Sequence, residues 1–288
     1  MTMKKVILFG GTGKLGRRVA IELQRQKYDV TAVVRNHDKA AQLKNIVNQT
    51  IVADVCKAEE LKNICNGFDI IVSTLGKSVS PKDNSKPSFM KVDMKTNCNI
   101  LREGISASVK KFVYVSAFGA ENNLNLNYFR AHHIFSEKLK CSGMNYSIIK
   151  PPAIFSSFVD LMEMAKKGRL LTLGAGDKLT NPIYEGDLAE ICVNSIVDEN
   201  VVIEAGGKNV YTRKQINDLI QQHVKPGQRV MKMPIGLLSF GVSLIKLFDS
   251  NAYDKFAFYL EVMRHDLIAL KMGETSLEKY LSEKLYLE

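Results

Sequence analysis

Short apolar runs alternate with amphipathic stretches through the first 150 residues. The amphipathic stretches have the spacing of helices that cover a sheet, and the runs are apolar throughout, as strands buried on both faces are. Because a β-α-β crossover is almost always right-handed, this alternation predicts a doubly wound parallel sheet. The expected strands are Lys5–Phe9, Asp29–Val34, Thr50–Ala53, Asp69–Thr74, Lys111–Ser116 and Tyr146–Lys150, and the expected helices lie near Lys14–Gln26, Lys39–Asn45, Ala58–Asn66, Lys91–Ser108 and Asn127–Ser142.

The pattern changes after Pro151 and Pro152, where helical periodicity dominates. The expected helices are Phe155–Lys167, Glu185–Val197 and Arg213–His223, followed by two or three apolar helices between Pro234 and Leu285. The sequence therefore predicts an α/β fold: a Rossmann-like doubly wound sheet in residues 1–150 and a small, mostly helical C-terminal lobe in residues 151–288, closely packed on it. Residues 78–88 are expected to form a flexible loop after the fourth strand.

A glycine-rich turn follows the first expected strand and opens the first expected helix. It reads Gly10-Gly11-Thr12-Gly13-Lys14-Leu15-Gly16. Glycines let the chain turn tightly and let backbone N–H groups approach a pyrophosphate, and the last glycine permits close packing of the helix on the sheet. In this context the motif predicts a dinucleotide-binding site.

The end of the second strand indicates which dinucleotide is preferred. An NAD site usually has a carboxylate there for the ribose hydroxyls, whereas this chain has Arg35 and no carboxylate until Asp38. With Thr12 and Lys14, Arg35 is suited to a 2′-phosphate, so NADP(H) is expected in preference to NAD(H). Asp54, after the third strand, either meets the adenine edge or caps the following helix.

The charge distribution bears on the expected partners. Among the 288 residues the net charge is +10, with 24 basic and 12 acidic residues in the first 150 and 16 basic and 18 acidic residues in the rest. The basic excess thus falls in the half that carries the glycine turn. Since no basic stripe interleaved with aromatic residues accompanies it, a small-molecule substrate is expected and no nucleic acid partner.

The spacing of the cysteines and histidines indicates whether the chain holds a metal ion. The five cysteines form no Cys-x-x-Cys pair and the five histidines have no metal-ligand spacing, so no metal site is expected and a reduced, cytoplasmic chain is predicted. The apolar stretch Pro234–Phe248 contains glycines, serines and a lysine and is too short to span a bilayer. Its helices are more typical of a core or of a homo-oligomer interface than of a lipid site.

The glycine turn and later motifs resemble the atypical short-chain dehydrogenase/reductases, close to the NmrA-like and putative NAD(P)-dependent epimerase group. The resemblance extends from residue 4 to about residue 224. It implies that cofactor-binding positions follow several strands and that the segment from Ser73 to Gly76 lies near the cofactor's ribose. The matching segments are Asp54-Val55, Ser73-Thr74-Leu75-Gly76, Val115-Ser116-Ala117-Phe118-Gly119, residues 142–152 and residues 180–189.

One position departs from that family. Active members of the wider family carry Tyr-x-x-x-Lys, and the corresponding residues here are Tyr128 and His132. The resemblance implies that Tyr128 exchanges a proton while hydride moves to or from the nicotinamide, that Ser116 assists it, and that His132 replaces the lysine. A neutral imidazole can bond the ribose but supplies little of the positive charge that lowers the pKa of the tyrosine.

Three interpretations follow from this constellation. The favoured one is an NADP(H)-dependent oxidoreductase or epimerase-like enzyme with a degenerate motif, acting on a small or lipophilic carbonyl or hydroxyl substrate such as a quinone. The second is a non-catalytic NADP(H)-sensing regulator that acts on a protein partner, as NmrA-like proteins do. The third gives Tyr128, His132 and His133 only a structural role on their helix.

Overall fold

A computed structural model describes residues 3–285 of the chain. They form two compact units. Unit 1 comprises the described part of Met1–Lys77 with Pro87–Lys150 and Leu188–Ile203. Unit 2 comprises Ser78–Lys86, Pro151–Asp187 and the described part of Glu204–Glu288. The units share the boundary expected after residue 150 and also interleave along the chain; the expected two-domain division stays a prediction.

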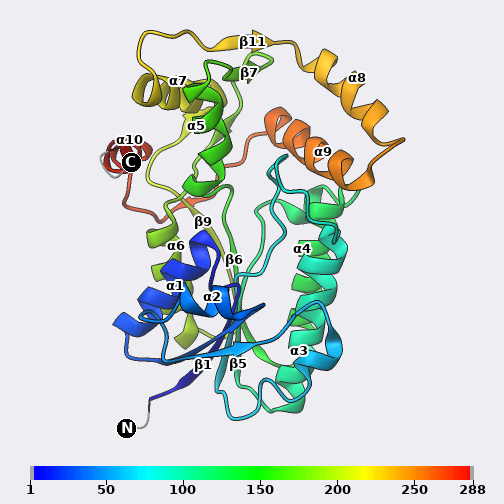
Figure 1. Ribbon diagram of the computed structural model, residues 1–288, viewed down its shortest axis with the longest axis vertical. Helices are drawn as coiled ribbons and strands as arrows, with labels where there is room; N and C mark the ends of the chain where they lie inside the picture. The colour runs from blue at the N-terminus through cyan, green and yellow to red at the C-terminus, as the bar shows by residue number, and fades with distance from the viewer. Residues whose placement is uncertain (1–2, 286–288) are drawn as a thin grey trace. The chain divides into compact units, whose positions relative to one another are not determined.

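The central sheet has eight strands in the order β12-β9-β6-β5-β4-β1-β2-β3 (Figure 1). In this order across the sheet, each strand from β6 to β3 runs parallel to its neighbour. The strand β12 is likewise parallel to β9. This confirms the predicted Rossmann-like α/β fold. The strands are β1 (Lys5–Phe9), β2 (Asp29–Val34), β3 (Gln49–Val52), β4 (Ile70–Ser73), β5 (Lys111–Val115), β6 (Asn145–Lys150), β9 (Val201–Gly206) and β12 (Leu270–Lys271).

Six strands lie where the apolar runs predict them, with ends that differ by at most one residue. The strands β9 and β12 were not predicted. β9 is only partly buried over Val201–Glu204, and β12 is a two-residue edge strand whose residues are exposed. Neither has the continuous apolar character that identifies a strand buried on both faces.

The helices of unit 1 bury one face against the sheet. In α1 (Lys14–Arg25) the buried residues include Leu15, Val19 and Leu23, spaced four apart as on one side of a helix. Figure 1 shows α3 and α4 side by side. The remaining helical elements are α2 (His37–Ala41), η1 (Ala58–Leu61), η2 (Met90–Thr96), α3 (Asn97–Ser106), η3 (Ala120–Asn122), α4 (Asn127–Lys140), η5 (Ser195–Val197) and α6 (Glu185–Asn194), whose first turn belongs to unit 2.

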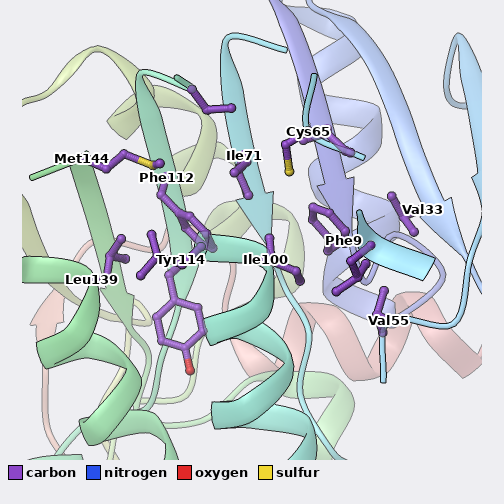
Figure 2. Packing of buried hydrophobic residues seen from close by; sticks show 14 of the residues in the cluster. Phe9, Val33, Val55, Cys65, Ile71, Ile100, Phe112, Tyr114, Leu139 and Met144 are labelled. Carbon is purple, nitrogen blue, oxygen red and sulfur yellow. The ribbon is translucent and has the colours of Figure 1, made fainter. Parts of the chain in front are cut away.

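Aromatic and aliphatic side chains fill the space between the sheet and α3 and α4 (Figure 2). Phe112 and Phe135 lie with ring centroids 5.6 Å apart, and Tyr114 packs edge-on against Phe135 at 4.6 Å. All three residues are fully buried. Burying a side chain of this size contributes roughly 1.5–3 kcal/mol, so these contacts stabilise the packing of α4 on β5.

Unit 2 has a core of its own around Phe155, Leu170 and Leu277. Its longest helices are α7, which begins with a capping box between Thr212 and Gln215, and α9, capped by Asp249. The elements are η4 (Phe155–Phe158), α5 (Val159–Lys166), β7 (Leu171–Leu173), β8 (Leu179–Thr180), β10 (Tyr211–Thr212), α7 (Arg213–Val224), β11 (Met231–Met233), α8 (Ile235–Ile245), α9 (Ser250–Arg264) and α10 (Leu277–Leu285).

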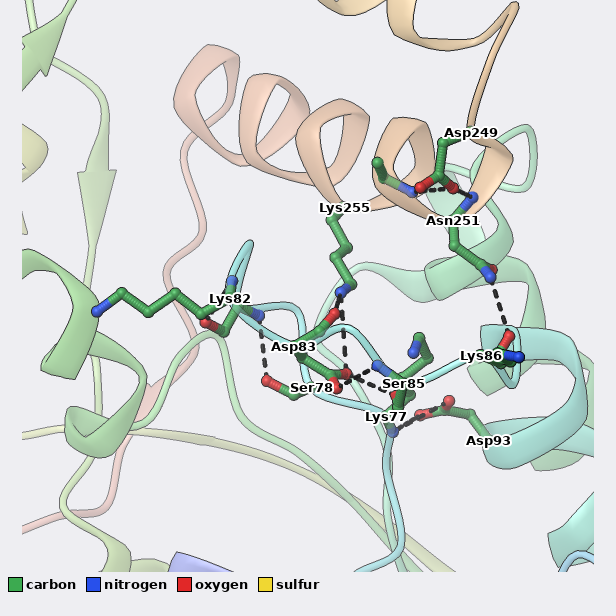
Figure 3. Close-up of polar contacts among 12 residues, drawn as sticks. Lys77, Ser78, Lys82, Asp83, Ser85, Lys86, Asp93, Asp249, Asn251 and Lys255 are labelled. Carbon is green, nitrogen blue, oxygen red and sulfur yellow. Dashed lines mark hydrogen bonds and ion pairs between the residues drawn. The ribbon is translucent and has the colours of Figure 1, made fainter.

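The loop Ser78–Lys86 belongs to unit 2 (Figure 3). It has no regular structure, as the sequence predicts, but polar contacts hold it at several points. The ammonium of Lys255 donates to the carbonyl of Asp83, Asn251 Nδ2 donates to the carbonyl of Lys86 at 2.9 Å, and Lys82 pairs with Glu163. The loop is therefore attached to α9 and α5 rather than unconstrained.

Candidate nucleotide site and buried polar network

The glycine turn fits tightly against the end of β4. Gly10 has a φ of +84°, a conformation that L side chains rarely adopt. A Cβ on Gly16 would lie 2.1 Å from the carbonyl oxygen of Gly10, and a Cβ on Gly10 would lie 2.7 Å from Thr74 Oγ1. Both positions therefore require glycine for the fold of the turn itself.

Gly13 differs from these two glycines because its outer side is open. Only the Gly10 oxygen, at 3.3 Å, lies within 4 Å of a Cβ built on Gly13. Gly13 is the N-cap of α1 and supplies no side chain to the helix N-terminus. The first N–H groups of α1 thus remain for an external acceptor, and the turn fits the pyrophosphate of a dinucleotide.

The residues expected to bind the 2′-phosphate of the cofactor are on the surface. Thr12, Lys14 and Arg35 are exposed, and Arg35 follows the last residue of β2 directly. The next residue, Asn36, is occupied as the N-cap of α2, where its side chain accepts from Lys39 N at 3.0 Å.

Asp54 and Val55 follow β3. Asp54 Oδ1 accepts from Cys56 N at 3.0 Å, which forms an Asx turn and does not cap the following helix, because the N-cap of η1 is Lys57. Val55 is buried in the core of unit 1. Asp54 as a cofactor ligand stays a prediction.

The segment after β4 is anchored by buried hydrogen bonds. Ser73 Oγ donates to Asn97 Oδ1 at 2.6 Å, and Thr74 Oγ1 donates to the carbonyl of Phe9 at 3.2 Å. Leu75 is half-buried, and a Cβ on Gly76 would lie 3.3 Å from Asp93 Oδ1. The segment expected near the ribose thus lies beside a carboxyl group that the sequence reasoning did not identify.

That carboxyl group, of Asp93, is completely buried on the π-helical turn η2. The backbone N–H of Lys77 lies 3.2 Å from both of its oxygens. Burial raises the pKa of Asp93 to about 8, although these bonds and the charge of Lys77 act in the opposite direction. Asp93 is therefore largely protonated at neutral pH.

Helical periodicity is the signal that could have revealed Asp93. The buried residues Asp93, Asn97, Ile100 and Gly104 follow one another at intervals of three or four, so the carboxyl lies on the inner face of the expected helix. A carboxyl group on the buried face of a helix is unusual, because aspartate is almost never fully buried unless it has a partner.

His132 links Asp93 to Tyr114. Its Nδ1 lies 2.7 Å from the phenol oxygen of Tyr114, and its Nε2 lies 3.4 Å from Asp93 Oδ1. The side chain is buried, and burial lowers the pKa of His132 to about 4. The imidazole is thus neutral at neutral pH and supplies no positive charge.

Tyr128 lies one turn before His132 on α4 and is half-buried. Its ring packs edge-on against Phe89 and His132, with centroid distances of 5.5 and 4.8 Å. Burial first, and the nearby Asp93 second, raise the pKa of Tyr128. This is the opposite of the effect that the family's lysine has on its tyrosine.

Ser116 extends the same network. Its Oγ lies 3.2 Å from Ser136 Oγ, and Ser136 Oγ donates to the backbone carbonyl of His132 at 2.8 Å. The fold therefore gathers Tyr128, His132 and Ser116 around α4, together with Asp93 and Tyr114. Their catalytic roles stay a prediction.

Two further expectations concern metals and cysteines. Within residues 3–285, no group of three or more His, Cys, Asp and Glu side chains is arranged to hold a metal ion. All five cysteines are free thiols. The cytoplasmic location stays a prediction.

A family model described as NAD(P)H-binding matches residues 10–199. The chain belongs to this family. The match includes the glycine turn, the end of β4 and α4, and it confirms that the resemblance is to an NAD(P)H-binding family. The chain therefore has an NAD(P)H-binding domain, and the glycine turn lies within the matched residues.

Two curated proteins are similar to this chain in sequence, and one solved structure is similar to it in fold. The chain is 24% identical to the photosystem II assembly factor Ycf39 of Trieres chinensis, over 88% of this chain and 80% of the relative. It is 28% identical to the divinyl chlorophyllide a 8-vinyl-reductase of Arabidopsis thaliana, over 85% of this chain and 64% of the relative. The NADPH complex of a quinone oxidoreductase from Escherichia coli has the same fold, with a TM-score of 0.72, 19% identity and coverage of 97% of this chain and 99% of that one.

Proposed function

We propose that this protein is an NADPH-dependent reductase that transfers hydride to a lipophilic, conjugated acceptor. The observation that carries the proposal is the neutral imidazole of His132 at the position of the family's lysine, next to a tyrosine whose pKa is raised. Bound NADPH would supply the hydride. The remaining chemistry falls to side chains of unit 1.

The cofactor would be held by the glycine turn and its surroundings. The N–H groups at the start of α1 suit the pyrophosphate, and the exposed Arg35, Thr12 and Lys14 suit a 2′-phosphate. The segment Ser73–Gly76 lies beside the Asp93 network and would meet the ribose near the reacting ring.

The protonation state of Tyr128 favours reduction over oxidation. Oxidation of a hydroxyl group needs a base, and a phenol with a raised pKa is not deprotonated at neutral pH. Reduction needs a proton donor, which a protonated phenol provides. His132 would serve as a positioning residue in this scheme, because Tyr114 and Asp93 flank its two ring nitrogens.

The weak acidity of Tyr128 also bears on the substrate. A conjugated acceptor spreads the negative charge that follows hydride addition, so it makes a smaller demand on the proton donor than an isolated ketone does. Quinones and vinyl groups attached to a conjugated ring have this property. Two similar proteins are named as a quinone oxidoreductase and an 8-vinyl-reductase, which supports this class of substrate.

The decisive experiment follows NADPH oxidation at 340 nm, the absorbance band of the reduced nicotinamide, with a short-chain benzoquinone as acceptor and a simple ketone for comparison. We expect turnover with the quinone and much slower turnover with the ketone. Faster oxidation of a secondary alcohol with NADP⁺ than reduction of either acceptor would overturn the proposal. Tight NADPH binding, measured by fluorescence, serves as the control for a folded site.

A second candidate function is a sensor of the NADPH to NADP⁺ ratio that does not turn over. The neutral His132 favours it as well, because a tyrosine that lacks a cationic neighbour is a poor catalyst. Similarity to assembly factors supports it further. NADPH binding with no consumption across a broad panel of quinones, enones and ketones would select this alternative.

A further inference from the structure

The helix α8 exposes a row of large apolar side chains. The row, called the apolar stripe below, has exposed fractions from 47% at Leu244 to 88% at Phe248. Its spacing of three and four residues places it on one side of α8 and of the turn that continues the helix. The apolar stripe consists of Leu237, Phe240, Leu244, Leu247 and Phe248.

Both hydroxyl groups of α8 are hydrogen-bonded within the protein, and Ser239 Oγ also accepts from Arg264 at 2.8 Å. Ser239 Oγ donates to the carbonyl of Ile235, and Ser243 Oγ donates to the carbonyl of Ser239, each at 3.0 Å. Residues 235–245 carry no charged side chain. A helix whose hydroxyls are bonded to its own backbone can enter a hydrocarbon phase without losing hydrogen bonds.

All the Asp, Glu, Lys and Arg residues close to the apolar stripe on its N-terminal side, and within it, are basic. Residues 219–248 include four basic side chains and neither Asp nor Glu. The four are exposed: Lys225, Arg229, Lys232 and Lys246. Asp249 follows, but its carboxylate accepts from the N–H groups of Asn251 and Ala252 at the start of α9. This segment is thus basic in a half of the chain that is net acidic.

From these features we infer that α8 and its basic flank dock on an anionic lipid bilayer, with the apolar stripe inserted among the acyl chains. A helix of 11 residues is about 16 Å long, roughly half the thickness of the hydrocarbon core, so α8 would lie in the plane of the interface. No helix in residues 3–285 has the length and apolar character required to cross a bilayer.

The charge pattern favours lipid over a second copy of the chain. A two-fold interface through the apolar stripe would bring Lys246 of one copy close to the same residue of the other, and residues 219–248 contain no Asp or Glu to offset the two charges. An anionic surface instead attracts each of these cations. The nearly complete exposure of Phe248 also suits insertion better than a flat contact.

The test is sedimentation of the full chain with vesicles of phosphatidylcholine alone or with roughly one third phosphatidylglycerol. We expect binding to the anionic vesicles that weakens in high salt. The variant carrying Phe240→Ser, Leu247→Ser and Phe248→Ser should bind at least about tenfold more weakly, because it loses three inserting side chains. Val197→Ser, which changes a residue exposed by 76% on η5, is the matched control and should bind like the parent.

Two further measurements separate lipid from other occupants. Lys232→Glu with Lys246→Glu should abolish the preference for anionic vesicles while the protein stays folded, with at most a small loss of thermal stability because Lys246 Nζ lies 5.2 Å from the centre of the Tyr253 ring. Equal binding of the triple serine variant and the parent would overturn the inference. So would a concentration-dependent dimer, seen by sedimentation velocity without lipid and lost in that variant. Neither outcome depends on NADPH turnover, so the inference stands or falls separately from the proposed function.

Discussion

The Nδ1 atom of His132 lies 2.7 Å from the phenol oxygen of Tyr114. His132 stands at the fourth position of the motif in which the sequence resemblance implies a lysine. Since the imidazole is fixed from one side by β5 and from the other by Asp93, it is held within unit 1. The motif therefore differs from the family's in its electrostatics as well as in one residue type.

Cofactor preference should change when Arg35 is replaced. In Arg35→Asp, the carboxylate would repel a 2′-phosphate and accept from the ribose hydroxyls, so the ratio of NADPH to NADH affinity should fall by about 100-fold. Isothermal titration with both cofactors measures the ratio. Lys110→Asp makes the same charge change just before β5, at the end of the parallel strands opposite to that of Arg35, and should leave the ratio unaltered. An unchanged ratio in Arg35→Asp would mean that another group binds the phosphate.

Gly13→Ala should separate cofactor binding from folding. The turn has room for the added methyl group apart from the Gly10 oxygen at 3.3 Å, so the melting temperature should change little. The methyl group would, however, stand where the pyrophosphate approaches the backbone, and NADPH affinity should fall by about tenfold or more. Gly236→Ala, at a position with open space around it, provides the control for a glycine-to-alanine change. Undiminished affinity in Gly13→Ala would place the pyrophosphate elsewhere.

Tyr128→Phe should affect acceptors unequally. Loss of the proton donor should lower kcat by about 100-fold or more with an isolated ketone, and by less than about tenfold with a quinone, whose reduced form tolerates negative charge. Because the pKa of Tyr128 is raised, kcat of the parent should show no increase between pH 6 and 9 from phenol ionisation. Steady-state kinetics of the variant with both acceptors measures the first effect, with Tyr146→Phe as control. The pH dependence of kcat in the parent measures the second. Equal losses with the two acceptors would contradict the role given to Tyr128.

Asp93→Asn should change how stability depends on pH. The pKa of Asp93 is raised from 3.8 to about 8, so the folded state holds its proton more tightly than the unfolded state does. The resulting stabilisation is complete below about pH 4 and is lost as pH rises through 8. Asparagine does not ionise, so the free energy of unfolding of the variant, measured by denaturation at each pH, should rise relative to that of the parent by up to about 1.4 kcal/mol per pH unit across this range.

The comparison between parent and Asp93→Asn is best made from pH 6.5 to 8. Below pH 6.5 the depressed pKa of His132 destabilises both proteins as pH falls toward 4. Asp38→Asn, an exposed aspartate on α2, is the control and should follow the parent at every pH. A constant difference between parent and Asp93→Asn would mean that the carboxyl is ionised in the folded state throughout.

The sequence was sufficient for six of the eight strands of the central sheet and for the glycine turn, because these depend on local patterns. Apolar runs placed β1 and β2 to the residue, and glycine spacing placed the start of α1. The network around His132 was beyond such reasoning. Asp93 meets His132 only because η2 and α4 pack together, a tertiary relationship across 39 positions that no local spacing encodes.

Burial likewise determined what residue type alone could not. A histidine is equally compatible with a charged or a neutral group, and only its surroundings lower the pKa of His132 to about 4. For the same reason the apolar residues of α8 were expected in a core or a subunit interface. In the structure, Val242 is buried whereas Phe240 is exposed by 71%.

The attachment of the loop Ser78–Lys86 to α9 also has a consequence for biosynthesis. Lys255 and Asn251 follow their partners in the loop by 172 and 165 positions. At translation rates of about 5–20 residues per second, the loop leaves the ribosome roughly ten to thirty seconds before those partners do. During that interval the nascent loop has neither contact and is open to proteases and chaperones, so unit 2 reaches its native form only near the end of synthesis.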